Sequence, residues 1–101
     1  MNTQPELQAK LEELLGSRNV YYQPPASLKM KYPAIRYETI DIEKKYANNL
    51  SYLYRTRYQL TVISKEPDHE VIRKILDLPL SSFGRHYVAD NLNHDVINLY
   101  Y

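Results

Sequence analysis

The sequence predicts an α+β fold, a mostly antiparallel sheet of four to five strands flanked by two helices. Two segments, one near the N-terminus and one around residue 70, carry apolar residues at helical spacing. The segments between and after them alternate with a period of two, which is typical of strands. The order helix, strands, helix, two strands lacks the β-α-β alternation of parallel sheets. With 101 residues, the chain is expected to form a single domain over 1–101.

The first helix is predicted over residues 3–15. Thr3 and Glu6 fit a capping box, and Gly16 suits the residue after a helix end. The apolar side chains that would share one face are Leu7, Leu11, Leu14 and Leu15. This pattern favours an amphipathic helix that packs on a sheet.

Two strands are expected after that helix. Residues 19–23 are rich in Val and Tyr, and the following Pro24 and Pro25 interrupt regular structure. Residues 34–42 form the second candidate, preceded by Pro33. Both alternating series of 34–42 mix apolar and polar residues, so the pattern does not decide which series faces the core.

Residues 51–64 give the strongest strand pattern. One alternating series consists of Tyr52, Tyr54, Thr56, Tyr58, Leu60 and Val62. The other consists of Leu53, Arg55, Arg57, Gln59, Thr61 and Ile63. We expect the tyrosine-rich series to face the core or a neighbouring subunit, and the arginine-containing series to face solvent or a charged partner.

A second helix is predicted over residues 66–78, with Pro67 and Asp68 at its start and Pro79 after its end. Two further strands are expected over 81–89 and 95–101. The segment 90–94 between them is predicted to be their turn, because Asp, Asn and His tolerate unusual backbone angles.

The composition excludes several classes of chemistry. The absence of cysteine rules out disulfides, thiolate zinc sites and cysteine nucleophiles. The two glycines, Gly16 and Gly84, are too few and too far apart for a phosphate-binding loop. A net charge of +1 argues against a dedicated nucleic-acid binder. No apolar run is long enough to span a membrane, and residues 1–10 lack a signal-peptide core, so an intracellular soluble protein is expected.

Charge and tyrosine content favour an interface. The chain has eleven tyrosines, and tyrosine is enriched at protein interfaces. All charged residues of 17–37 and of 44–65 are basic, whereas those of 38–43 are acidic. These segments could pair across neighbouring strands, pair across a subunit boundary, or form an ordinary solvated face.

Two chemical sites are compatible with the sequence, and each has a plainer interpretation. A hairpin could bring His86 and His94 together, and with Asp90 or Asp95 they could bind zinc. Their spacing matches no standard metal motif, so structural histidines are favoured.

A ribonuclease or toxin would instead use His86 as general base, with Arg85, Tyr87 and the Arg55–Arg57 pair around a phosphodiester. The near-neutral charge argues against that hypothesis. Tyrosines interleaved with these arginines could also stack nucleic-acid bases, or simply form a buried sheet face.

Several strings of the sequence resemble a known family. They are YPAIRYE at 32–38, ANN at 47–49, RYQLTVI at 57–63, PD at 67–68 and FGRHYVADNLNHD at 83–95. Together they resemble small tailed-phage and prophage proteins encoded among the head–tail joining genes, of the tail terminator or tail completion type. The resemblance covers roughly residues 30–101. The family pattern has Asp after Phe83, where this chain has Gly84.

The resemblance implies structural work rather than catalysis, with no cofactor and no metal. Tail terminators form a hexameric ring that caps the tail tube protein and joins it to the head-side connector or stopper, and DNA passes through the lumen without specific binding. The chain would then be made in the host cytoplasm and reside at the head–tail junction of the virion, with no membrane contact. The alternatives are another neck protein, a stopper or minor capsid protein, and, from a different class, the small ribonuclease.

Under this hypothesis, subunit or partner contacts are expected in three segments. They comprise Tyr52, Tyr54, Arg55 and Arg57 in the central strand, His86, Asp90, Asn91, Asn93, His94 and Asp95 in the last hairpin, and Tyr100 and Tyr101 at the end.

Overall fold

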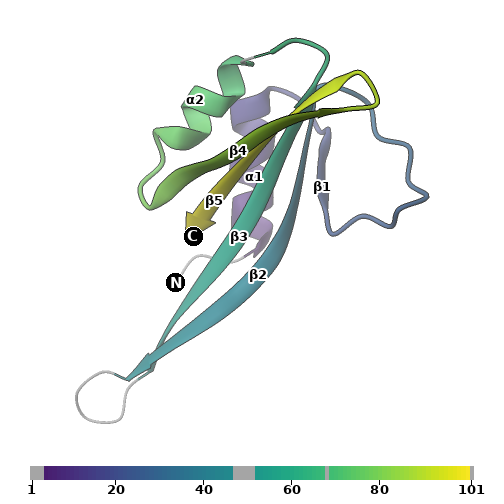
Figure 1. Ribbon diagram of the computed structural model, residues 1–101. Coiled ribbons are helices and arrows are strands. Elements are labelled where there is room, and N and C mark those ends of the chain that lie inside the picture. The colour runs from purple at the N-terminus through teal and green to yellow at the C-terminus, as the bar shows by residue number, and fades with distance from the viewer. Residues whose placement is uncertain (1–3, 47–51, 68, 101) are drawn as a thin grey trace.

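The computed structural model describes residues 4–46, 52–67 and 69–100. In this part of the chain it contains two helices and one five-stranded sheet, with strand order β1-β2-β3-β5-β4 (Figure 1). The elements are α1 (Gln4–Leu15), β1 (Val20–Tyr22), β2 (Ala34–Tyr46), β3 (Tyr52–Ser64), α2 (Glu70–Leu76), β4 (Ser81–Ala89) and β5 (Leu92–Tyr100). Strand β1 pairs with β2 in parallel, and every other pair is antiparallel. The predicted α+β class is confirmed.

Both helices cover the same face of the sheet, which we call the helix face. Leu7 and Leu11 of α1 and Ile75 of α2 are fully buried in one cluster with side chains of β2, β3 and β5. In Figure 1, α1 lies behind the sheet, so the view looks onto the opposite, open face. Where side chains of the strongly alternating β3 segment are described, the tyrosine-rich series faces the core as predicted. The other series departs from the prediction at Ile63, which is 4% exposed rather than open to solvent. Tyr58, Leu60 and Val62 are buried on the helix face, whereas the intervening side chains point to the open face.

The second helix is shorter than predicted, beginning at Glu70 and ending at Leu76 rather than spanning 66–78. Its start is fixed by His69, whose ring Nδ1 accepts a hydrogen bond of 3.1 Å from the backbone N–H of Val71. The helix therefore begins after Pro67 and Asp68, the two residues expected at its start, and His69 is its N-cap. Asp77 is the C-cap, two residues before Pro79.

The last hairpin has a tighter turn than predicted. Asp90 and Asn91 have φ of 53° and 61°, so both residues take the left-handed conformation that a two-residue hairpin turn demands. Strand β5 therefore begins at Leu92, not at Asp95, and Asn93 and His94 belong to the strand. Strand β2 also extends further than predicted, to Tyr46.

A buried tyrosine links the first helix to the sheet. Tyr37 on β2 is fully buried, and its hydroxyl donates to Gln8 Oε1 at 2.5 Å and accepts from Gln4 Nε2 at 2.6 Å. Gln8 also donates to the backbone oxygen of Val20 at 2.9 Å. One side-chain network thus ties together α1, β1 and β2.

Removing this hydroxyl by Tyr37→Phe is expected to lower the free energy of unfolding by about 1–2 kcal/mol, because both glutamine amides lose a partner at a site with little water. Urea denaturation checks the value. Tyr22→Phe is the matched control, since the Tyr22 hydroxyl bonds Thr39 at an exposed position and its loss should matter less. Equal losses in the two variants would contradict a special role for the Tyr37 network.

The same burial predicts a loss of stability at alkaline pH. Burial raises the pKa of Tyr37 and of Tyr58 above the ordinary value of 10.0. Below pH 10 the phenols are protonated in both the folded and unfolded states, and above it the unfolded state loses protons first. The free energy of unfolding should therefore fall as pH rises from about 10 through the folded pKa values. Urea midpoints between pH 8 and pH 11 test this, and the Tyr37→Phe/Tyr58→Phe double variant should show a shallower fall than Tyr87→Phe.

Candidate interaction surface

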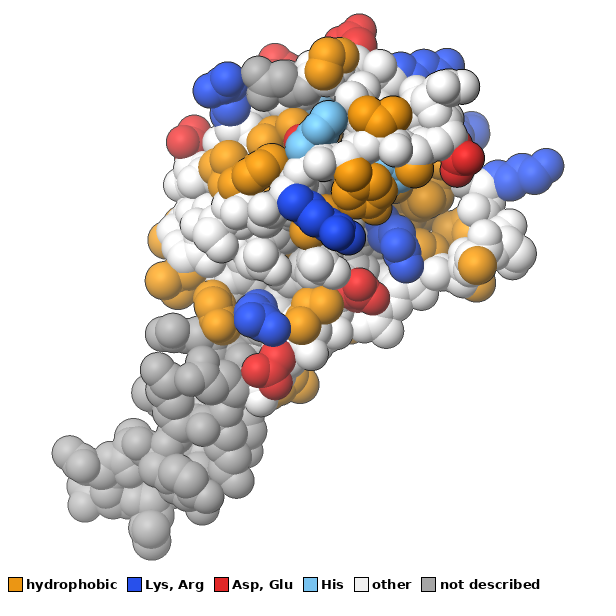
Figure 2. Space-filling view, viewed as in Figure 1, with side chains coloured by type: hydrophobic (Ala, Val, Ile, Leu, Met, Phe, Trp, Pro, Cys, Tyr) orange, Lys and Arg blue, Asp and Glu red, His pale blue; other side chains and the backbone are white. Residues whose placement is uncertain are grey.

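The open face of the sheet carries a mixture of basic, polar and aromatic side chains. Cross-strand register places Arg36, Thr61, Val96 and Arg85 in one row across it. Figure 2, viewed from the same side as Figure 1, shows basic side chains set among hydrophobic ones over the body of the molecule. The face has no helix over it in this view. The loop 23–33 borders part of it, because Pro24, Ala26, Met30 and Tyr32 line a groove together with Ile63, which is buried.

A groove of about 330 Å³ lies between this loop and the last hairpin. Tyr87 and His94 stack within it, with ring centroids 4.7 Å apart and planes inclined by 14°. The Arg85 guanidinium lies 5.1 Å from the Tyr87 ring centroid, within cation–π range. The residues that line the groove are Pro24, Ala26, Met30, Tyr32, Arg36, Thr61, Ile63, Tyr87, Asp90, Leu92 and His94.

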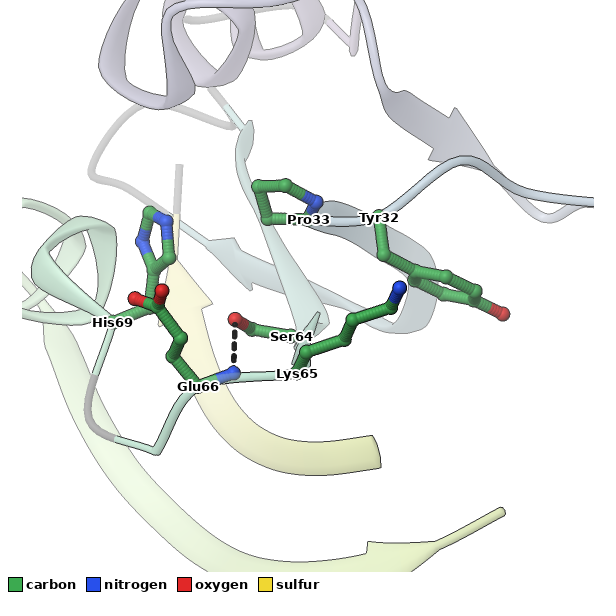
Figure 3. A pocket seen from close by; sticks show the side chains of 6 residues that line it. All are labelled: Tyr32, Pro33, Ser64, Lys65, Glu66 and His69. Carbon is green, nitrogen blue, oxygen red and sulfur yellow. Dashed lines mark hydrogen bonds between the residues drawn. The ribbon is translucent and has the colours of Figure 1, made fainter. Parts of the chain in front are cut away.

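A smaller pocket of about 210 Å³ lies where β3 leads into α2 (Figure 3). Its polar groups already have local roles. Ser64 Oγ accepts from the backbone N–H of Glu66 at 3.1 Å, and His69 caps α2. Tyr32 and Pro33, joined by a cis peptide bond, form the opposite wall. These contacts stabilise the turn between β3 and α2.

The predicted contact residues of the central strand lie mostly on a projecting ribbon. Strands β2 and β3 pair as far as Tyr46 opposite Tyr52, whereas β5 follows β3 only as far as Arg57. The distal part is thus a two-stranded ribbon that extends away from the helices (Figure 1). Tyr54 and Arg55 lie on it, and the side chains of Tyr52, Tyr54 and Arg55 are outside the described residues.

Arg57 lies where the ribbon joins the body. It is opposite Asp41 on β2 and opposite Tyr100 on β5, so all three share the open face. The Arg57 Nε is buried without a hydrogen-bond partner among the described groups. The backbone N–H of Tyr100 donates to the Leu80 oxygen at 3.1 Å, which ties the end of β5 to the start of β4. Tyr101 lies outside the described residues.

The predicted residues of the last hairpin are divided between the two faces. His94 stacks on Tyr87 on the open face, whereas His86 lies opposite Asp95, which is buried on the helix face. Asn93 bridges strands, accepting from His86 Nε2 at 3.2 Å and donating to the Lys65 oxygen at 3.3 Å. The hairpin therefore does not bring His86 and His94 together as a zinc site would require. The described part of the chain holds no cluster of three or more metal-ligating side chains.

The residues of the ribonuclease hypothesis also diverge. Arg85 and Tyr87 project from the open face, and His86 between them projects from the other. The structure thus separates the base from the cation that would have to share its substrate. Within the described residues, no helix is long and apolar enough to cross a membrane.

Sequence reasoning missed the apolar side chains left exposed along the sheet edges. Ile42 on β2 is 59% exposed, and Phe83 and Val88 on β4 are 49% and 63% exposed. Alternation alone could not identify them, because it does not show which strands lie at an edge.

The comparisons with known proteins add no family assignment. No protein-family model matches the chain, and no curated protein matches it.

Proposed function

We propose that this protein is a ring-forming structural subunit of the tail terminator type, at the head–tail junction of a tailed phage. The structural observation that supports an assembly role is the β2–β3 ribbon, which leaves the body of the protein with Ile42 exposed on it. Isolated two-stranded ribbons are at best marginally stable in water. A partner that packs against the ribbon would bury its apolar side chains.

The phage assignment rests on the sequence strings quoted above, and the architecture is compatible with it. In this proposal, six copies of the chain form a closed ring. The ring contacts the tail tube protein on one side and the head-side connector on the other. DNA passes through the lumen, and the near-neutral charge of the chain suits a surface that does not grip it. The subunit acts by assembly and needs neither cofactor nor metal for this role.

Electron microscopy of particles that carry the protein tests this proposal. We expect density for six copies capping the tail tube at the head–tail junction. Density elsewhere in the neck would favour the stopper or minor capsid alternative. Two results together would favour the ribonuclease alternative over the assembly role. They are particles that contain no copy of the chain, and hydrolysis of RNA by the wild type that the His86→Ala variant no longer shows.

A further inference from the structure

Strand β4 forms an open edge of the sheet. It lies next to β5, and no strand lies on its other side in the described part of the chain. All of its residues from 82 to 88 are exposed. Unpaired strand edges are templates for pairing with another chain, and charged residues or proline usually protect them. Strand β4 contains no proline, and Arg85 is its only charged side chain with His86 neutral.

We infer that β4 of one copy pairs in an antiparallel ladder with β4 of a second copy, about a two-fold axis through His86, and that the unassembled protein is a dimer. The inference goes beyond the proposed function and does not rest on it. A two-fold contact uses the same surface on both copies and ends at two copies, whereas a ring needs two different surfaces. The dimer contact is therefore separate from the contacts of the ring.

A bulge at Gly84 changes which side chains of β4 share a face. Phe83 lies opposite Ile97 on β5. Arg85 lies opposite the next residue, Val96, so Gly84 is an extra residue in β4. A Cβ atom at Gly84 would lie 3.0 Å from the Val96 oxygen, so a larger residue there would press on the β5 backbone. Because of the extra residue, Phe83 lies on the helix-face side of β4 and Arg85 on the open face.

The exposed apolar side chains of β4 match one another in this dimer. Phe83 and Val88 both project from the helix-face side, and each is about half exposed or more in the single copy. With His86 on the axis, Val88 of one copy lies opposite Phe83 of the other, and Gly84 is again the extra residue. The axis creates this contact twice, so four apolar side chains become buried.

Arginine and tyrosine alternate on the open face of the dimer. Arg85 already lies beside its own Tyr87, with the guanidinium 5.1 Å from the ring centroid. The axis through His86 places Arg85 of each copy opposite Tyr87 of the other. The four side chains then form a square with the two arginines at diagonal corners, so each guanidinium has a tyrosine ring on two sides. Cation–π attraction favours this arrangement.

Other registers of the same two strands are less favourable. Opposite side chains of an antiparallel pair share a face, so the axis passes through a residue rather than between two residues. An axis through Arg85 would place two arginines directly opposite each other, which is destabilising. An axis through Tyr87 would place His86 against Val88. It would also leave Phe83 opposite the turn of the other copy. The axis through His86 pairs apolar with apolar residues and keeps the arginines apart.

The dimer contact leaves the β2–β3 ribbon free. In the strand order β1-β2-β3-β5-β4, strand β5 separates β4 from both strands of the ribbon (Figure 1). Two copies that meet through β4 therefore keep Ile42 outside their contact. Because the two surfaces are different parts of the sheet, a substitution can remove one contact without the other.

Single cysteines test the two-fold axis, because the chain contains no cysteine of its own. In the dimer, residue 86 faces its own copy at a Cα separation of about 4.5–5.5 Å, which suits a disulfide. Oxidised glutathione should link His86→Cys into a dimer about tenfold faster than Ser82→Cys, because facing thiols have a millimolar effective concentration. Ser82 is the matched control, since it is exposed on the same strand but lies opposite Ala89 in the dimer. Thermal melting of both variants should match the wild type, because both positions are exposed.

Sedimentation equilibrium without cross-linking gives an independent measurement. We expect Val88→Asp to weaken dimerisation at least about tenfold, because the symmetric contact loses two apolar pairs and gains two buried carboxylates. Ile42→Asp is the control, since Ile42 is similarly exposed but lies on the ribbon. This control should dimerise like the wild type.

The contrary results are distinct. Equal cross-linking of His86→Cys and Ser82→Cys would indicate random collision, and unchanged dimerisation of Val88→Asp would place the contact elsewhere; either result would overturn the inference. A wild-type chain that stays monomeric over its accessible concentration range would also overturn it, and electron microscopy would still decide the proposed ring. A dimer that Val88→Asp dissociates, combined with particles that lack six copies at the junction, would support the pairing and overturn the ring.

Discussion

An Ile42→Asp variant is expected to fold like the wild type and to lose assembly. Ile42 is 59% exposed on the ribbon, so the substitution removes little burial within one copy. At an interface, the same change removes a buried isoleucine and desolvates a carboxylate. The combined cost is about 2–4 kcal/mol per contact, or a fall in association of roughly 30- to 1,000-fold.

Sedimentation velocity over a concentration series measures the effect, with thermal melting as the folding check. Leu28→Asp is the matched control, because Leu28 is also exposed, at 41%, but lies on the loop 23–33 and not on the ribbon. If Ile42→Asp assembles as well as Leu28→Asp, the ribbon is not an assembly surface, and the structural support for the proposed function is lost.

The sequence was most informative where a pattern has a local physical cause. The alternation in β3 set its two faces, because successive strand side chains point in opposite directions whatever the neighbouring strand is. Pro79 and the apolar positions Val71, Ile72 and Ile75 located the second helix. Its start was misplaced because proline and aspartate are common first-turn residues, whereas a histidine cap such as His69 has no comparable sequence signature.

Features that depend on distant partners could not be predicted in this way. The last residues of β2 are polar and resemble a loop, but their pairing with β3 makes them a strand as far as Tyr46. Proximity along the hairpin suggested that His86 and His94 meet, yet their registers put them on opposite faces. The strand order, in which β5 lies between β3 and β4, makes β4 an outer strand of the sheet. That order is set by long-range packing rather than by any one segment.

The same strand order leads us to expect a large loss of stability from substitutions at the centre of the sheet. Leu60 lies on β3, the middle strand, between Tyr37 on β2 and Ile97 on β5, and all three are fully buried. Helix side chains cover them from one side, so little can move to fill a space left at this position. A Leu60→Ala variant is expected to lose about 2–5 kcal/mol in free energy of unfolding, from lost burial and the cavity that remains.

Such a loss is large compared with the roughly 5–15 kcal/mol free energy of unfolding of a typical domain. At about 4–8 °C per kcal/mol, it would lower the melting temperature by about 8 °C or more. Urea and thermal denaturation measure both quantities. Val88→Ala on the outer strand is the control, since Val88 is 63% exposed in the single copy and its truncation should cost less than about 0.5 kcal/mol in the monomer. A loss below about 1 kcal/mol for Leu60→Ala would mean that the core relaxes around the missing side chain. That result would be incompatible with tight packing of Leu60 between the buried side chains of β2 and β5.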